Sequence, residues 1–204
     1  MKKNGKTDNK KIVNFLFEVG ILAKTPRSGF SFLGTGKQTV AEHINRVSYI
    51  GYMMALMDKT VDISKVLQMC LLHDISETRI SDLNWVNQKY VERKEDEAHK
   101  DITDSVPFGS HMMDLINEYV ERKTKESILV KDADNLELLL SLKNELDIGN
   151  KRALAWTKPS IKRLKSKQAK ILAKEIMSTY SNDWWFDKKS QKSDWWVNRN
   201  KKTK

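Results

Sequence analysis

Residues 67–76, LQMCLLHDIS, decide how the chain folds, because they are nearly all apolar up to the adjacent histidine and aspartate. Asp62 is of a type that caps helices, which predicts a helix from residue 63 to about residue 75. His73 and Asp74 then lie at the end of a buried helix, where an ionised carboxylate needs a cation, a metal or several hydrogen-bond donors. A divalent metal bound by both side chains is one interpretation. A capped, salt-bridged helix end is the other.

A second helix is predicted upstream, from residue 39 to about residue 56. Thr39 and Glu42 have the spacing of a capping box, in which each side chain accepts a hydrogen bond from the other residue's backbone N–H. His43 follows on the same face as Val47, so we expect its imidazole to point inward. It is either a satisfied core histidine or a metal ligand.

A third apolar helix is predicted from about residue 126 to residue 146. Asp134 lies on it beside Ala133 and Leu136, at positions otherwise suited to packing. Its carboxylate is either a metal ligand or a helix-face group paired with Lys131.

The rest of the chain also favours helices. Helical spacing recurs over residues 12–22, and polar helices are predicted around residues 88–104 and 111–123. A last helix carries Pro159 in its first turn and continues to about residue 176. Few stretches alternate with period two, so the fold class is predicted to be all-α.

The positive charge is concentrated at the C-terminal end. The chain has 204 residues and a net charge of +10, yet residues 1–150 carry 21 basic and 23 acidic side chains, against 16 and 4 in residues 151–204. We therefore expect one domain over residues 1–180 and a basic tail over residues 181–204. The tail holds two tryptophan pairs, Trp184, Trp185, Trp195 and Trp196. We expect them to dock on the domain or contact a second subunit; stacking on nucleic acid is an alternative that we do not expect.

Composition excludes several classes of protein. The single cysteine, Cys70, cannot form an internal disulfide, which argues against a disulfide-stapled secreted scaffold and a cysteine-based zinc finger. No export signal or membrane-spanning stretch is visible. We expect a cytoplasmic protein that does not act at a membrane.

Two imidazoles and two carboxylates on three apolar helices form a ligand set suited to one divalent transition metal. Four protein ligands around a six-coordinate ion leave positions for water and a substrate oxygen, as a catalytic site requires. Metal-assisted phosphoester hydrolysis is the chemistry that such a site favours. Glu77, three residues after Asp74, is placed either to transfer a proton or to sit in solvent as a helix-end glutamate.

His43, then His73-Asp74, then Asp134 resembles the H…HD…D pattern of the HD-domain metal-dependent phosphohydrolases. The segments TPRSGF at 25–30, TVAEHINRV at 39–47, LLHDISE…SD at 71–82 and KDADNLE at 131–137 are similar to the 5′-deoxynucleotidase branch. The resemblance covers roughly residues 10–180. It implies an all-α HD-domain helical bundle, and removal of the 5′-phosphate from deoxynucleoside 5′-monophosphates.

The same resemblance implies roles for individual residues. His43, His73, Asp74 and Asp134 would hold one divalent metal (Co, Mn, Mg, Fe, Ni or Zn), Glu77 would be the general acid/base and Asp82 a pocket carboxylate. Arg27 would bind phosphate, and a guanidinium in the loop before the His43 helix is able to do so bidentately, although a surface arginine is the alternative. Relatives also imply a homodimer.

Two rival functions remain at this point. One keeps the metal site and changes the substrate, giving a phosphodiesterase or a nucleotide triphosphohydrolase. The other is a nucleic-acid-binding protein that acts through the basic tail.

Overall fold

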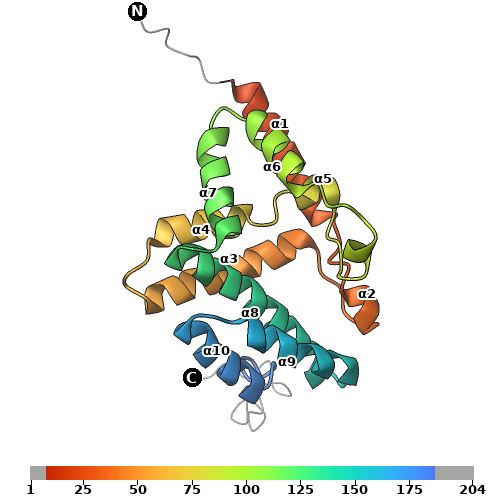
Figure 1. The fold of residues 1–204 in the computed structure, drawn as a ribbon. Helices are drawn as coiled ribbons and strands as arrows, with labels where there is room; N and C mark the ends of the chain where they lie inside the picture. Colours follow the sequence, from red (N-terminus) through yellow and green to blue (C-terminus); the bar gives the residue numbers. More distant parts are fainter. Residues whose placement is uncertain (1–7, 187–204) are drawn as a thin grey trace, which may run out of the picture.

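The computed structural model describes residues 8–186, and Figure 1 shows its fold. These residues form no strand, only an isolated bridge between Pro26 and Thr39, so the predicted all-α class is confirmed. The α-helices of the described residues are α1 (Asn9–Val19), α2 (Phe30–Leu33), α3 (Val40–Met57), α4 (Ile63–Leu72), α5 (Glu77–Ile80), α6 (Glu95–Asp104), α7 (Gly109–Glu121), α8 (Lys125–Asp147), α9 (Leu154–Arg163) and α10 (Lys167–Ser178). Short 3-10 turns are η1 (Gly20–Ala23), η2 (Asn87–Lys89) and η3 (Lys151–Ala153).

Both predicted helix caps before the His-Asp pair are present. The Thr39 hydroxyl accepts from the Glu42 N–H at 3.2 Å, and Glu42 Oε2 accepts from the Thr39 N–H at 2.7 Å. Asp62 accepts from the Lys65 N–H at 3.1 Å and so begins α4. Helix α4 ends at Leu72, one turn earlier than expected, which makes His73 its C-cap.

Two other expectations about helices are wrong. The predicted helix at 88–104 begins only at Glu95, and the residues before it include the 3-10 turn η2, which follows a turn where the Asn84 side chain accepts from the backbone N–H groups of Val86 and Asn87. The loop expected before the His43 helix, which carries Arg27, contains the short helix α2.

The predicted last helix is in fact two helices, and Pro159 lies in the middle of α9. The break has a long-range cause. The carboxylate of Asp132, buried in α8, accepts from the backbone N–H groups of Lys165 at 2.9 Å and Ser166 at 2.6 Å. Ser166 then caps α10. These bonds satisfy donors that a continuous helix would have used internally.

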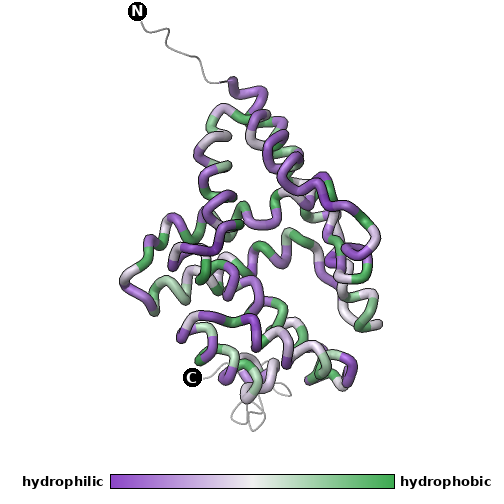
Figure 2. Tube along the Cα trace, viewed as in Figure 1, coloured by the Kyte–Doolittle hydropathy of each residue, from purple (hydrophilic) through white to green (hydrophobic). Residues whose placement is uncertain are grey.

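Helices α3 and α8 run through the middle of the molecule, with α1, α6 and α7 towards one end and α9 and α10 at the other (Figure 1). Helix α4 packs against α3. A Cβ added at Gly51 of α3 would lie 2.6 Å from the Cys70 sulfur of α4, so glycine is what permits these helices to approach so closely. In Figure 2, hydrophobic segments recur along α3 and α4, whereas α6 is largely hydrophilic.

The buried core consists of three clusters, and the predicted site lies between two of them. On α3, Val47 belongs to the central cluster and Val40 to a second one near α1 and α7. On either side of His73-Asp74, Cys70 belongs to the central cluster and Ile75 to the second one. The predicted site residues therefore lie at the boundary between two hydrophobic clusters and not inside either of them.

The start of the tail contacts the domain. The Ser181 backbone N–H donates to Asp147 Oδ2 at 2.8 Å, and Trp184 borders a cavity of about 600 Å³ between α3, α8 and α10. Trp195 and Trp196 lie outside the described residues, and the division at residue 180 stays a prediction. Over residues 8–186, none of the helices combines the length and apolarity that crossing a bilayer requires.

Candidate active site

The structure brings together the four side chains predicted to bind a metal. His43 comes from α3, His73 and Asp74 from the end of α4, and Asp134 from α8. His43 Nε2 lies 3.4 Å from His73 Nε2, 3.3 Å from Asp134 Oδ1 and 3.5 Å from Asp74 Oδ2. His73 Nε2 lies 3.3 Å from Asp74 Oδ2. Residues separated by as much as 91 positions thus present ligand atoms to one point.

Hydrogen bonds on the far side of each imidazole fix its orientation. His73 Nδ1 donates to the Cys70 carbonyl at 2.8 Å, and His43 Nδ1 donates to Glu137 Oε2 at 2.6 Å. Each Nδ1 therefore carries a hydrogen, and the Nε2 atoms of the two rings face each other. Metal-binding histidines are oriented in this way by carboxylate or carbonyl acceptors.

The chemistry of this donor set fits a divalent metal. Metal–nitrogen and metal–oxygen bonds are about 2.0–2.2 Å long, which places neighbouring ligands of one ion about 3 Å apart. His43, His73 and Asp134 have ligand atoms within 4.8 Å of one another, and Asp74 Oδ2 lies within 3.5 Å of both imidazoles. Two adjacent nitrogen lone pairs repel each other unless a cation or a proton lies between them.

The raised pKa of His43 also indicates that the surrounding carboxylates favour a positive charge at this point. Burial and Arg27 disfavour the imidazolium, but hydrogen bonds to Asp134 and Glu137 outweigh them and raise the pKa of His43 to about 9. Burial opposes ionisation of Asp74 and Asp134, yet His73 next to Asp74 and Lys131 next to Asp134 hold the pKa of each carboxyl well below its usual range. A metal must displace the His43 proton, so its binding tightens as pH rises.

Asp134 makes the pairing that one interpretation of the sequence expects and keeps an oxygen for the other. Its Oδ2 accepts from Lys131 Nζ at 2.6 Å, the pairing expected of a helix-face carboxylate. Its Oδ1 faces His43 at 3.3 Å. The lysine therefore occupies one oxygen and leaves the other for the site.

Glu137 supports the site, although sequence reasoning gave it no role. It is 1% exposed, and it accepts from Arg46 Nε at 2.8 Å and Gln38 Nε2 at 2.7 Å in addition to His43. Burial opposes its ionisation, but His43 and Arg46 lower the pKa of Glu137 to about 2. It remains a carboxylate at neutral pH and keeps the hydrogen of His43 on Nδ1.

Replacement of Glu137 by glutamine is expected to weaken metal binding about 10- to 100-fold, the range typical of such supporting groups. The amide keeps the size of the side chain, but it is a weaker acceptor and is able to turn its NH2 towards His43. Titration of the metal-stripped protein measures this change. The variant Glu126→Gln, in the first turn of α8, is the matched control, because Glu126 is partly buried and accepts from the Asp62 N–H but touches no candidate ligand. Equal affinities of E137Q and E126Q would contradict the assigned support.

Arg27 and Asp82 lie beside the four candidate ligands. Arg27 Nη1 is 3.3 Å from Asp74 Oδ2 and 3.7 Å from Asp82 Oδ1. The Arg27 N–H donates to the Gln38 carbonyl at 2.8 Å, which closes the base of its loop. Burial opposes the charge of Arg27, but Asp74 and Asp82 raise its pKa above the usual range, so the guanidinium stays charged.

Asp82 holds the loop that carries Arg27. Its Oδ2 accepts from the backbone N–H of Ser28 at 2.6 Å and from the Ser28 hydroxyl at 3.0 Å. The preceding residue, Ser81, has a φ of 64°, a conformation that is costly for a residue other than glycine. This bend takes the chain from α5 towards the Arg27 loop, and strain of this kind is common next to functional sites.

Glu77 lies next to this group, buried to 4% exposure at the start of α5. Burial, Asp74 and Asp82 raise its pKa to about 9, against the opposing effect of Arg27 and Arg93. Its carboxyl group therefore carries a proton at neutral pH. Arg93 Nη2 is 3.6 Å from Glu77 Oε1, a contact that sequence reasoning missed. The only signal was an arginine in a charged stretch before α6.

Two histidines outside the predicted site stay outside it. His99 is buried on α6, where burial lowers its pKa, and His111 hydrogen-bonds to Gln68 Oε1 at 2.7 Å on an exposed surface. The seven predicted residues thus gather in one region, with Glu137, Arg46 and Arg93 around them.

The chain is similar to proteins of one family. The family model described as "HD domain" matches residues 19–177. The 5′-deoxynucleotidase HDDC2 of Mus musculus is 27% identical over 146 residues, covering 69% of this chain and 72% of that protein, and that of Bos taurus is 28% identical over 148 residues, covering 69% and 70%. The structure of the PH0347 protein from Pyrococcus horikoshii OT3 aligns with a TM-score of 0.69 and 26% identity over 81% of this chain and 98% of that one. Because the family match spans most of the chain and includes every predicted site residue, this chain belongs to the HD domain family.

Proposed function

We propose that the chain is a metal-dependent phosphomonoester hydrolase that removes the 5′-phosphate from deoxynucleoside 5′-monophosphates. One observation carries this proposal: the ligand atoms of His43, His73, Asp74 and Asp134 converge beside the guanidinium of Arg27. The similarity to proteins named 5′-deoxynucleotidases supports the choice of substrate.

In this proposal, the four converging side chains hold one divalent metal, whose identity among Co, Mn, Mg, Fe, Ni and Zn stays open. When bound, such an ion activates water and polarises a phosphoryl oxygen. Arg27 holds the other phosphoryl oxygens, because a charged, partly buried guanidinium binds phosphate through two parallel hydrogen bonds. Asp82 keeps Arg27 in place through Ser28.

Glu77 supplies the proton that the leaving group needs. Hydrolysis breaks the bond between phosphorus and the 5′-oxygen, and an alkoxide leaves poorly unless it is protonated. A buried carboxyl with a raised pKa is a suited general acid. The proton passes from Glu77 to the 5′-oxygen, and the attacking water returns a proton to Glu77.

The deciding experiment is a phosphate-release panel on metal-stripped protein. Ribo- and deoxynucleoside 5′-monophosphates are each tested with Co, Mn, Mg and Zn, alongside a phosphodiester and a deoxynucleoside triphosphate. We expect inorganic phosphate from the deoxynucleoside monophosphates. Cleavage of the diester alone, or release of pyrophosphate or triphosphate, would overturn the proposed substrate in favour of a phosphodiesterase or a triphosphohydrolase.

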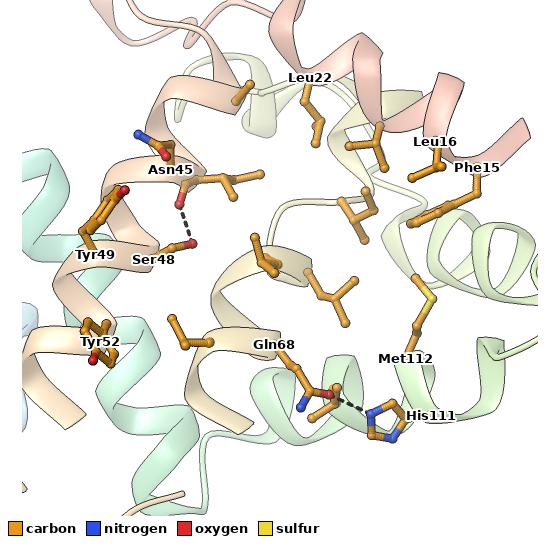
Figure 3. Close-up of a pocket in the computed structure, with 18 residues that line it drawn as sticks. Phe15, Leu16, Leu22, Asn45, Ser48, Tyr49, Tyr52, Gln68, His111 and Met112 are labelled. Carbon is orange, nitrogen blue, oxygen red and sulfur yellow. Dashed lines mark hydrogen bonds between the residues drawn. The ribbon is translucent and has the colours of Figure 1, made fainter. Parts of the chain in front are cut away.

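We also propose that the protein is a homodimer. An apolar cavity of about 840 Å³ lies between α1, α3, α4 and α7, and its lining contains none of the seven predicted site residues (Figure 3). Leu16 and Tyr49 at its edge are more than half exposed, which is a costly surface for a monomer. Sedimentation equilibrium is expected to give twice the mass of 23.7 kDa, and a monomer at micromolar concentration would refute the dimer.

A cytoplasmic location is part of the same proposal. The single thiol, Cys70, is buried, and burial raises its pKa to about 12, so it is neither a disulfide partner within the chain nor a reactive thiolate. A protein without disulfides is typical of a reducing compartment. Fractionation of the source cells tests this location.

A further inference from the structure

Arg93 lies against the proton-transfer residue from outside the group of candidate ligands. It precedes α6, and its Nη2 is 3.6 Å from Glu77 Oε1. Its side chain is 27% exposed, whereas Glu77 is 4% exposed. The guanidinium therefore closes the outer side of the buried carboxyl.

A ring of contacts holds Arg93 in this position. Arg93 Nε forms an ion pair with Glu95 Oε2 at 3.4 Å, although it has no hydrogen-bond partner among the described residues, and Glu95 Oε1 accepts from the Ser76 hydroxyl at 3.3 Å. Ser76 is the neighbour of Glu77 in the chain. The ring thus links the first residue of α5 to the first residue of α6, and Arg93 bridges them.

The two oxygens of Glu77 have different surroundings. Oε1 faces Arg93, whereas Oε2 is buried and has no hydrogen-bond partner in the described residues. An unpartnered buried oxygen is costly, so an oxygen of this kind in a native site needs an explanation. An oxygen that is kept for a reactant provides this explanation, because Glu77 is close enough to Asp74, Asp82 and Arg27 for their charges to act on it.

We propose that Arg93 is a positioning residue: it binds Oε1 of Glu77 and so leaves Oε2 as the oxygen that exchanges a proton with the reactants. This inference rests on the proposed function, in which Glu77 is the general acid/base. In this inference Arg93 acts through Glu77 and not on the phosphate, because its ion pairs are with Glu77 and Glu95 and none is with a candidate metal ligand. Arg27, not Arg93, approaches the candidate ligands themselves.

The variant Arg93→Gln tests the role of the bridge. We expect kcat to fall about 10- to 100-fold with little change in KM, because the general acid turns away while substrate contacts remain. R93K is expected to recover part of the loss. In an E77Q background, R93Q is expected to cause no further loss, since residues that act through one another are not additive. R79Q is the matched control, because Arg79 lies on α5 together with Glu77 but pairs with Glu18 at 2.6 Å on the outer surface.

Several outcomes would overturn the inference. A raised KM with unchanged kcat would make Arg93 a phosphate-binding residue. An equal loss from R93Q with and without Glu77 would show that it does not act through Glu77. If the parent released no phosphate from any monophosphate, the proposed function would fail separately. The carboxyl 13C resonance of Glu77 would still test Arg93, because removing the cation is expected to raise the pKa of Glu77, and an unchanged titration would refute the contact.

Discussion

The variant Asp74→Ala is expected to lose both its bound metal and its hydrolytic activity. Asp74 Oδ2 lies within 3.5 Å of both imidazoles and 3.3 Å from Arg27, so it links the two histidines to the guanidinium. A metal contributes several kcal/mol to stabilising the transition state, and each 1.36 kcal/mol is a factor of ten in rate. We therefore expect kcat/KM to fall at least about 10³-fold, with metal content after desalting reduced in parallel.

Asp114→Ala is the matched control for this loss, because Asp114 is exposed on α7. Circular dichroism and thermal unfolding show whether both variants keep the helical fold. A folded D74A protein that hydrolyses substrate as fast as the parent would contradict the whole scheme. Retained activity without retained metal would contradict the role of the metal alone.

The ligand-bearing helices were predictable because each carries a polar or charged side chain within a stretch that is otherwise apolar. His43 and Asp74 lie in stretches whose apolar spacing predicts burial, and burial of such groups is costly unless they have partners. The caps at Thr39 and Asp62 are also local, since each bonds a backbone group three residues away. Interactions between residues three positions apart can be recognised from the spacing of residue types in the sequence.

The supporting residues were not predictable in the same way, because their partners are distant. Glu137 bonds to His43 across 94 positions, and Asp132 ends a helix through Lys165, 33 positions away. The available signal was a carboxylate on an apolar helix, which both residues share with Asp134. Only the packing of α3, α9 and α10 on α8 assigns each carboxylate its partner. Local spacing predicted that α8 carries buried charges, but not which residue each one binds.

The variant Glu77→Gln is expected to keep its metal and substrate affinity but lose turnover about 10²- to 10⁴-fold. At neutral pH the raised pKa makes Glu77 a neutral carboxylic acid, and glutamine has the same shape and the same charge. The substitution therefore removes the transferable proton and little else. Phosphate release at saturating substrate measures kcat, and metal titration measures the affinity. Glu97→Gln, on the exposed side of α6, is the control.

The pH profile separates loss of a proton donor from loss of packing at Glu77. A general acid works only while protonated, so kcat of the parent is expected to fall as pH rises through the pKa of Glu77. That pKa is about 9 for the protein alone, and a bound cation lowers it, because positive charge favours the carboxylate. The falling limb should therefore lie at or below pH 9 and be absent from E77Q, whose residual rate has no such acid to lose. A parallel limb in both proteins would assign the titration to another group, and the proton donor would have to be sought elsewhere in the site.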